Sequence, residues 1–446
     1  MVVHLAIDPC SIKEMVKMGL ENHSKISLVI IYGFLMCFPA ATILFGSSGI
    51  DKYDHSGAVG KSIITGSMPP ASGDWIINQN TTMADHQLIM NGTIQVLPSY
   101  TLEVLDSNIT FSNNADGVWV NGGQLILGNA SVTQYNEIGA ENGGTLELVG
   151  TRLQDFDRAI NAMDSTIISI RDSMLTNGKI GITVHDFTGA LIENTSFIAI
   201  ENQSIAASFG KNLMVVGNHM IAGGNTYDCV GVDAGSVDTL DLINNTILNY
   251  HKSLFYQNVS NATIMSNYFA QEPDSPYLDG ELQFDTGCMS ILLENNTISN
   301  LTYDGIEIYR SKDFLIRNNT IRDTGAGTHI EHAPIENITI FNNNFINSDA
   351  LAKDASNINV LNNSFDDGTI RFRNCTGGMI MDNIICGPQL ELRDSSGFTV
   401  ANNSYPCKDR YPSIPGMLPA CILASIACCV ACIVFWRHLE LHPPPN

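Results

Sequence analysis

One short phrase recurs fourteen times between Leu102 and Tyr405 and limits the folds open to this chain. It consists of alternating apolar residues, one or two Asn or Asp, and then another apolar residue, as in Leu240–Ile247 and Phe314–Ile321. The second Asn marks the register, at Asn245, Asn267, Asn296, Asn319, Asn343, Asn363, Asn383 and Asn403. Degenerate copies carry Ser107, Ala130, Thr151, Ser173, Thr195 and His219 at this mark. The steps between marks run from 20 to 29 residues.

A repeat of this size is typical of stacked architectures, whose units bury their apolar faces only against their neighbours. Within each copy the apolar residues alternate, which is the pattern of strands with one buried face. The repeat therefore predicts an all-β solenoid, a parallel β-helix of about 14 coils. A β-sandwich or propeller with Asn-rich turns is the alternative, but such folds do not keep one phrase in register so many times.

The Asn residues have a physical role at a tight corner. Asn tolerates the left-handed backbone conformation, and its amide can bond the same amide one coil above. Stacked in register, the marks should form a ladder along one corner.

On this repeat the chain resembles the right-handed parallel β-helix repeat proteins of the pectin-lyase-like superfamily. The resemblance covers roughly residues 75 to 405, and Gly73–Ile77 through Asn91–Val96 resemble the entry strands of such domains. The superfamily includes surface proteins, carbohydrate-active enzymes and periplasmic copper-binding proteins. The resemblance implies a right-handed β-helix and is specific for fold, not for activity.

Two uncharged apolar stretches, residues 26–46 and 414–436, are each long enough to cross a hydrocarbon core about 30 Å thick. Lysines before the first and Arg437 after the second predict that both chain ends are cytoplasmic. A cleaved signal peptide is the alternative for the first stretch, but its leader and apolar run are long for one. The expected order is cytoplasmic segment 1–25, signal anchor 26–46, linker 47–74, ectodomain 75–406, linker 407–413, span 414–436 and cytoplasmic tail 437–446.

This topology predicts a plasma-membrane protein with an extracellular β-helix. Many Asn-x-Ser/Thr sequons, such as those at Asn80 and Asn91, agree with a glycoprotein, although several others, such as that at Asn244, belong to the corner phrase itself. A net charge of -23 argues against a nucleic-acid partner, because phosphates require a basic surface.

Five cysteines lie between the two predicted spans, so at least one has no partner among these five. Buried thiols are the default expectation. Successive coils bring Cys375, Cys386 and Cys407 close enough for a bridge, and the sequence leaves the pair open.

Residues at equal distance from the register mark should stack in columns, which allows a search for chemistry. Asp233, Glu307 and Glu331 each lie twelve residues before a mark and should point outward, because Ile306 and Ile330 point inward. Asp304 joins them as a fourth candidate catalytic carboxylate. Neighbouring offsets supply the candidate ligand-binding residues, which are Tyr256, Tyr303, Tyr309, Arg310 and His329. An ordinary solvated acidic face is the competing interpretation, since the chain has 45 acidic residues.

Metal chemistry receives little support from motifs. The predicted ectodomain has no His-x-His, Cys-x-x-Cys or Met cluster, and His329 and His332 should face opposite sides of a strand. We therefore expect no transition-metal site and no cofactor, although clustered carboxylates suit calcium. Near the C-terminal end, a cross-coil pair of Arg371 with Glu391 is expected.

Two functions remain. The first is a membrane-anchored surface protein with a structural or binding role, contacting polysaccharide or other envelope components. The second is a membrane-tethered glycoside hydrolase or lyase that uses the four carboxylates. Asp304–Tyr309 is similar to segments of β-helix glycosidases but lacks the further Asp pair, Gly-His-Gly and Arg-Ile-Lys stretches of polygalacturonases. Two insertions, Gly223–Asp228 and Gln271–Tyr277, flank the acidic patch.

Overall fold

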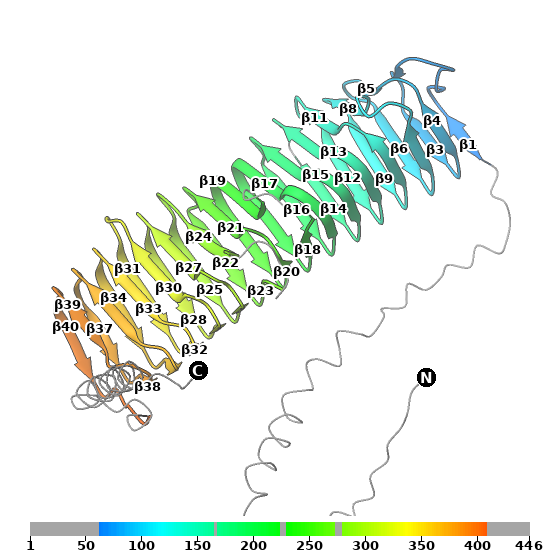
Figure 1. The fold of residues 1–446 in the computed structure, drawn as a ribbon. Helices are drawn as coiled ribbons and strands as arrows, with labels where there is room; N and C mark the ends of the chain where they lie inside the picture. The colour runs from blue at the N-terminus through cyan, green and yellow to red at the C-terminus, as the bar shows by residue number, and fades with distance from the viewer. Residues whose placement is uncertain (1–61, 165–166, 224–228, 273–278, 408–446) are drawn as a thin grey trace, which may run out of the picture. The chain divides into compact units, whose positions relative to one another are not determined.

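The computed structural model describes residues 62–164, 167–223, 229–272 and 279–407. These residues form a right-handed parallel β-helix of about 14 turns, which confirms the predicted solenoid (Figure 1). Each coil passes through three parallel sheets, here named sheets A, B and C in the order in which β27, β28 and β29 follow one another. The predicted membrane spans lie outside the described residues. Within the described part of the chain, no helix is long and apolar enough to cross a membrane.

Sheet A carries the predicted acidic patch. It consists of β2 (Trp75–Ile77), β5 (Ile94–Val96), β8 (Val118–Asn121), β11 (Ile138–Glu141), parts of β13 (Arg152–Met163), β15 (Met174–His185), β17 (Ser196–Val216) and β19 (Val230–Ile243), then β21 (Lys252–Gln257), β24 (Glu281–Phe284), β27 (Asp304–Tyr309), β30 (Ala326–Glu331), β33 (Ala350–Lys353), β36 (Ile370–Arg373) and β39 (Glu391–Arg393).

Sheet B follows sheet A in each coil. It consists of β3 (Thr81–Ala84), β6 (Thr101–Leu105), β9 (Gln124–Gly128), β12 (Thr145–Val149), β14 (Ile167–Arg171), β16 (Gly189–Glu193), the last parts of β17 and β19, β22 (Asn261–Met265), β25 (Met289–Glu294), β28 (Lys312–Arg317), β31 (Glu336–Phe341), β34 (Ser356–Leu361), β37 (Thr376–Met381) and β40 (Ser396–Ala401). At its start β1 (Ile63–Thr65) pairs antiparallel with β3.

Sheet C completes each coil. It consists of β4 (Gln87–Met90), β7 (Asn108–Phe111), β10 (Ser131–Tyr135), the first parts of β13, β15 and β17, β18 (His219–Ala222), β20 (Thr246–Leu248), β23 (Tyr268–Ala270), β26 (Thr297–Ser299), β29 (Thr320–Arg322), β32 (Asn344–Ile346), β35 (Ser364–Asp366) and β38 (Ile384–Cys386).

The predicted Asn ladder is present at the corner between sheets B and C. Asn319, for example, is buried, and its Oδ1 accepts hydrogen bonds from the backbone N and the Nδ2 of Asn296 at 2.9 and 3.0 Å. The residue before each rung takes the left-handed conformation, as Asn318 does with φ 57°. The first residue of each Asn pair thus takes the left-handed conformation, and the second makes the amide hydrogen bonds of the ladder. One mark was wrong, because Asn218 and not His219 bonds Asn245.

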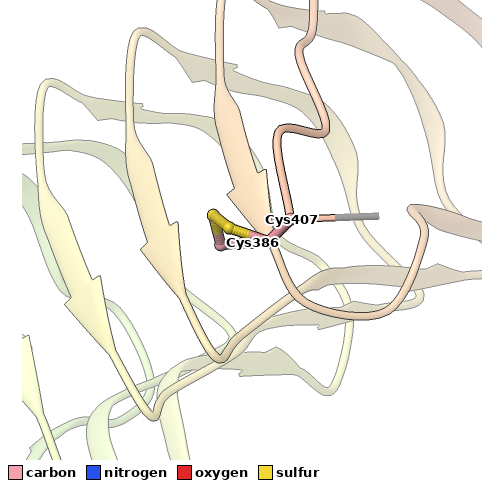
Figure 2. Close-up of a disulfide and its surroundings, with 2 residues drawn as sticks. All are labelled: Cys386 and Cys407. Atoms are coloured by element: carbon pink, nitrogen blue, oxygen red, sulfur yellow. A yellow bond between two sulfur atoms is a disulfide. The ribbon is translucent and has the colours of Figure 1, made fainter. Parts of the chain in front are cut away.

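The last coil is closed by a disulfide. Cys386 at the end of β38 is bonded to Cys407, which selects one of the pairs that the sequence left open (Figure 2). Cys229, Cys288 and Cys375 are buried thiols, as expected.

Candidate functional site

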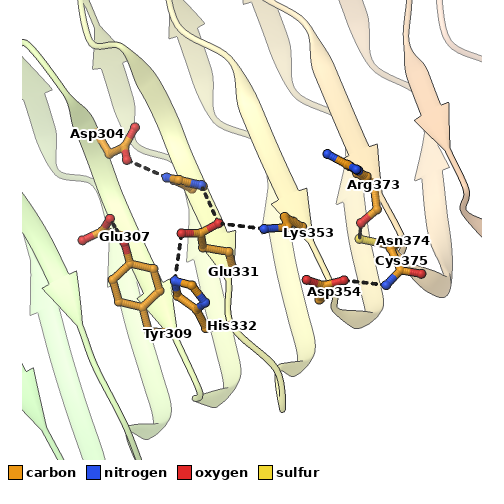
Figure 3. Close-up of polar contacts among 11 residues, drawn as sticks. Asp304, Glu307, Tyr309, Glu331, His332, Lys353, Asp354, Arg373, Asn374 and Cys375 are labelled. Atoms are coloured by element: carbon orange, nitrogen blue, oxygen red, sulfur yellow. Dashed lines mark hydrogen bonds and ion pairs between the residues drawn. The ribbon is translucent and has the colours of Figure 1, made fainter.

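Strand pairing places most of the predicted site residues on adjacent coils of sheet A. Glu307 of β27 pairs with His329 of β30, and Tyr309 pairs with Glu331. Ile306 and Ile330 are fully buried, so Glu307 and Glu331, the residues that follow them on β27 and β30, point away from the core as predicted. Figure 3 shows the resulting cluster, in which the labelled Asp304, Glu307, Tyr309 and Glu331 lie together. We name Asp304, Glu307, Tyr309, His329 and Glu331 the acidic cluster.

Glu331 does not share a column with Glu307, contrary to the prediction. Tyr309 pairs with Glu331, 22 residues on, whereas Lys312 pairs with Glu336, 24 residues on. The turn after β30 thus holds two additional residues. Counting back from Asn343 therefore misplaces Glu331 by two positions, and both positions are on the same outward face.

Ion pairs connect the two coils of the cluster to each other and to the next coil, which carries Lys353. His329 Nδ1 lies 2.6 Å from Asp304 Oδ2, and its Nε2 lies 3.6 Å from Glu331 Oε2. Glu331 also contacts His332 Nε2 at 3.0 Å and Lys353 Nζ at 3.7 Å (Figure 3). The hydrogen bond to Asp304 raises the pKa of His329, so the imidazole is held toward its charged form.

Glu307 is the buried carboxylate of the cluster, with 7% of its surface exposed. Its Oε1 accepts a hydrogen bond from the Tyr309 hydroxyl. Burial raises the pKa of Glu307, although the bond from Tyr309 opposes the shift. Burial together with the bond to Glu307 raises the pKa of Tyr309. This pair therefore holds protons more strongly than free side chains do.

Sequence reasoning missed Glu281 of β24, which extends the cluster by one coil. Burial, reinforced by the Glu307 carboxylate, raises the pKa of Glu281 to about 7. Lys252 Nζ lies 3.6 Å from its Oε1 and opposes the shift. The register between β21 and β24 shifts beside Lys252, so column counting could not find this pair.

Other predicted residues lie elsewhere. Asp233 occupies the Glu307 column, but three coil steps away, about 14 Å at 4.8 Å per step. Its Oδ2 accepts a hydrogen bond from Gln203 Nε2 at 2.7 Å, and burial raises its pKa. Tyr256 was wrongly predicted to contact a ligand, because it points inward and is completely buried. Tyr303 precedes β27 and is 59% exposed.

Arg310 lines a shallow depression of about 710 Å³ beside the cluster. His332, Pro334, Asp354 and Asn374 also line it, and polar and apolar groups contribute about equally to its walls. The prediction that His329 and His332 face opposite sides is wrong, since both imidazoles contact Glu331. The physical reason is that β30 ends at Glu331 and His332 takes φ 68°.

The predicted pairing of Arg371 with Glu391 holds in register, since the two residues are cross-strand neighbours. The ion pair of Arg371 is formed with Asp349 instead, at 3.2 Å.

The cluster contains donors suited to a metal ion. One donor atom each of Asp304, Glu307 and His329 lies within 4.8 Å of the others. The same groups also suit proton transfer, because a buried carboxyl, a tyrosine hydroxyl and a carboxylate-bound imidazole are neighbours. The parts of the two insertions at 224–228 and 273–278 lie outside the described residues.

The chain is similar to one family and to several solved structures. Residues 224–365 match the family described as the right handed beta helix region. A structure of PfbA, a surface adhesin of Streptococcus pneumoniae, is 14% identical and has a TM-score of 0.37, over 65% of this chain and 83% of that one. The periplasmic alginate epimerase AlgG is 10% identical with a TM-score of 0.36, over 74% and 85%. The A-module of the Azotobacter vinelandii mannuronan C-5 epimerase AlgE6 is 11% identical with a TM-score of 0.29, over 75% and 90%.

A comparison with curated proteins finds no match. The strand pairing, together with the match over residues 224–365, identifies the chain as a right-handed parallel β-helix protein.

Proposed function

We propose that this chain is a membrane-anchored cell-surface protein whose β-helix binds a polysaccharide or another envelope component through sheet A. The observation that carries the proposal is the acidic cluster, which presents hydrogen-bonding groups from β27 and β30 on one outward face. Sugar hydroxyls are recognised by such convergent acceptors and donors, with an aromatic ring against the sugar face. Tyr303 supplies an exposed ring beside β27.

The distribution of charge suggests the kind of polymer. Glu281, Asp304, Glu307 and Glu331 lie on three successive strands of sheet A. Such a surface repels uronate polymers and suits neutral or amino sugars. We therefore expect binding to neutral or amino-sugar polysaccharides and weaker binding to polyuronates.

A carbohydrate-active enzyme is the second candidate, and one observation favours it. Glu307 has a raised pKa because it is buried, and its carboxyl lies within 4.8 Å of that of Asp304. Two carboxyl groups about 5 Å apart, one of them with a raised pKa, can act as acid and nucleophile on a glycosidic bond. Asp233 has no part in this candidate, because it lies too far along the column.

The test uses the full-length chain against a panel of neutral, amino-sugar and uronate polysaccharides. Binding is measured by a pull-down assay, and cleavage by release of reducing ends or of unsaturated products. Tyr303→Ala should weaken binding by about 1 kcal/mol, roughly fivefold, through loss of the aromatic contact. Tyr268→Ala is the matched control, because Tyr268 is a partly exposed tyrosine on sheet C.

The two candidates predict different outcomes. Release of products that disappears in Glu307→Gln but persists in Glu147→Gln, an exposed glutamate on sheet B, would establish the enzyme. Binding without release supports the binding protein. If Tyr303→Ala binds every polymer as the unmodified chain does, sheet A is not the binding face.

A further inference from the structure

We propose that Asp304, Glu307 and His329 form a binding site for a divalent transition-metal ion of the zinc class. One donor atom of each lies within 4.8 Å of the other two. They come from two adjacent strands, since Glu307 of β27 pairs directly with His329 of β30 and Asp304 lies at the start of β27. The site goes beyond polysaccharide binding and does not depend on it.

The site has more acidic than basic groups, because the two carboxyl groups of Asp304 and Glu307 share one imidazole, that of His329. Glu307 is 7% exposed, and its Oε1 already accepts the Tyr309 hydroxyl, which leaves the other oxygen to face an ion. Among the described residues, no lysine or arginine nitrogen lies within 4.0 Å of a carboxylate oxygen of Asp304 or Glu307. Buried carboxylates in proteins are generally paired with a cation or bound to a metal.

The neighbouring lysines are engaged with other carboxylates. Lys252 contacts Glu281 at 3.6 Å, and Lys353 contacts Glu331 at 3.7 Å. These two cations therefore pair with carboxylates at the margins of the cluster, and Lys252 reaches Glu307 only through space, where it lowers the pKa of that carboxyl. The centre is occupied by the His329 imidazole, which is itself a metal ligand.

A second and independent feature is the support of the imidazole from behind. His329 directs Nδ1 toward Asp304, at 2.6 Å, and Nε2 toward Glu331, at 3.6 Å. Histidine ligands of metals are typically oriented by a carboxylate on the second ring nitrogen. Glu331 is held in turn by His332 at 3.0 Å, so the orienting carboxylate is itself fixed.

The donor set distinguishes between metals. Calcium takes six to eight oxygen ligands, whereas here one of three donors is a nitrogen. Imidazole with carboxylates suits zinc and its neighbours in the first transition row, and three protein ligands leave a position for water or substrate. The side chains of Asp304 and His329 are 19% and 27% exposed, so that position opens to solvent. On binding, the ion replaces the proton shared by Asp304 and His329, and that proton is released to solvent.

The experiment is a zinc titration of the full-length chain without a histidine tag, first stripped with a chelator. Zinc affinity is measured by competition with a chromophoric chelator, and cobalt substitution reports nitrogen coordination through its visible spectrum. We expect one equivalent of zinc per chain. Affinity should fall at least about 100-fold in His329→Ala and about 10- to 100-fold in Glu331→Gln, which removes only the orienting carboxylate.

The matched control is His185→Ala. His185 is also an outward histidine of sheet A beside a carboxylate, with Nε2 3.1 Å from Asp186, and this variant should bind zinc unchanged. Asp304→Asn preserves the shape of the site and serves as a second variant if His329→Ala is misfolded by far-UV circular dichroism. No polysaccharide is present, so the outcome is independent of sugar binding.

Three results would overturn the proposal. They are the absence of stoichiometric zinc, binding retained in both His329→Ala and Asp304→Asn, and calcium bound in preference to zinc. An equal loss in His185→Ala would likewise assign the binding to histidines elsewhere on the surface.

Discussion

Replacing Asn319 by alanine should remove one rung from the middle of the corner ladder. The Asn319 side chain accepts from the backbone N and Nδ2 of Asn296, at 2.9 and 3.0 Å. Its Nδ2 donates to Leu293 O and to Asn343 Oδ1, both at 3.0 Å. The residue is 1% exposed, so water cannot replace these partners without opening the corner.

The expected cost follows from this count. Each buried hydrogen bond contributes about 1 kcal/mol net, and a partner left unsatisfied costs about 1–3 kcal/mol. Four lost bonds therefore predict a destabilisation of about 4 kcal/mol. This is a large fraction of the 5–15 kcal/mol that typically separates folded and unfolded states.

Two measurements check the figure. Urea unfolding followed by far-UV circular dichroism gives the loss of free energy if the transition is two-state. Long repeat arrays can unfold in parts, so hydrogen exchange should locate the loss in peptides around Asn296 and Asn343.

The matched control is Asn318→Gly. Asn318 is exposed and has φ 57°, a conformation that glycine adopts freely. Its side chain makes two exposed hydrogen bonds, to Glu294 at 3.3 Å and from Asn342 at 2.7 Å. We expect a change of less than about 1 kcal/mol. If Asn319→Ala costs no more than Asn318→Gly, the ladder does not stabilise the fold as argued.

Three further predictions concern cysteines and one buried tyrosine. Cys386→Ser should cost about 3 kcal/mol, because the bond to Cys407 closes a loop of 21 residues, and faster hydrogen exchange confined to the last coil would verify it. Tyr256→Phe should leave the unfolding free energy unchanged or raise it by up to about 1 kcal/mol, since the buried hydroxyl has no hydrogen-bond partner among the described residues; a loss of 2 kcal/mol in urea unfolding would contradict this. Burial raises the pKa of Cys288 to about 11, so the native thiol stays protonated at pH 8 and should be alkylated only after unfolding, whereas rapid labelling of the folded chain would refute its burial.

The fold could be predicted because its determinants are local and repeated. Asn319 and the other rungs recur in one phrase of the sequence. The alternating apolar residues of that phrase show the periodicity of a strand. The error at His219 arose in a degenerate copy, where only one Asn is present and position alone cannot show which residue turns inward. In the structure Asn218 makes the rung, because its amide bonds Asn245.

The site was predicted less well because it depends on the residues between repeats. Column counting assumes equal turns, and the longer turn after Glu331 and the register shift beside Lys252 break that assumption. Tyr256 shows a second limit, since the alternation of side chains along β21 places it on the inward face with Leu254, despite its polar hydroxyl. A metal motif was not visible because Asp304 and His329 come from different coils, 25 residues apart.

The ladder and the acidic cluster occupy the same part of the β-helix, and this has a physical consequence. In earlier coils the Glu307 column is uncharged, with Trp119, Gly139, Asn161 and Thr183. The corners that accompany these coils lack Asn rungs, as at Ala130, Thr151, Ser173 and Thr195.

Charged groups appear in the column once Asn rungs connect successive coils. A site built from two coils works only if their spacing is fixed to a fraction of an ångström. The corners at Asn319 and Asn343 lie in the coils of β27 and β30, after β28 and β31, and the 3.0 Å bond between them holds that spacing. If the zinc site is formed as proposed, Asn319→Ala should weaken zinc binding although Asn319 lies on a different corner, and Asn318→Gly should not. Equal zinc affinities in the two variants would show that the strands of sheet A hold the site without help from the ladder.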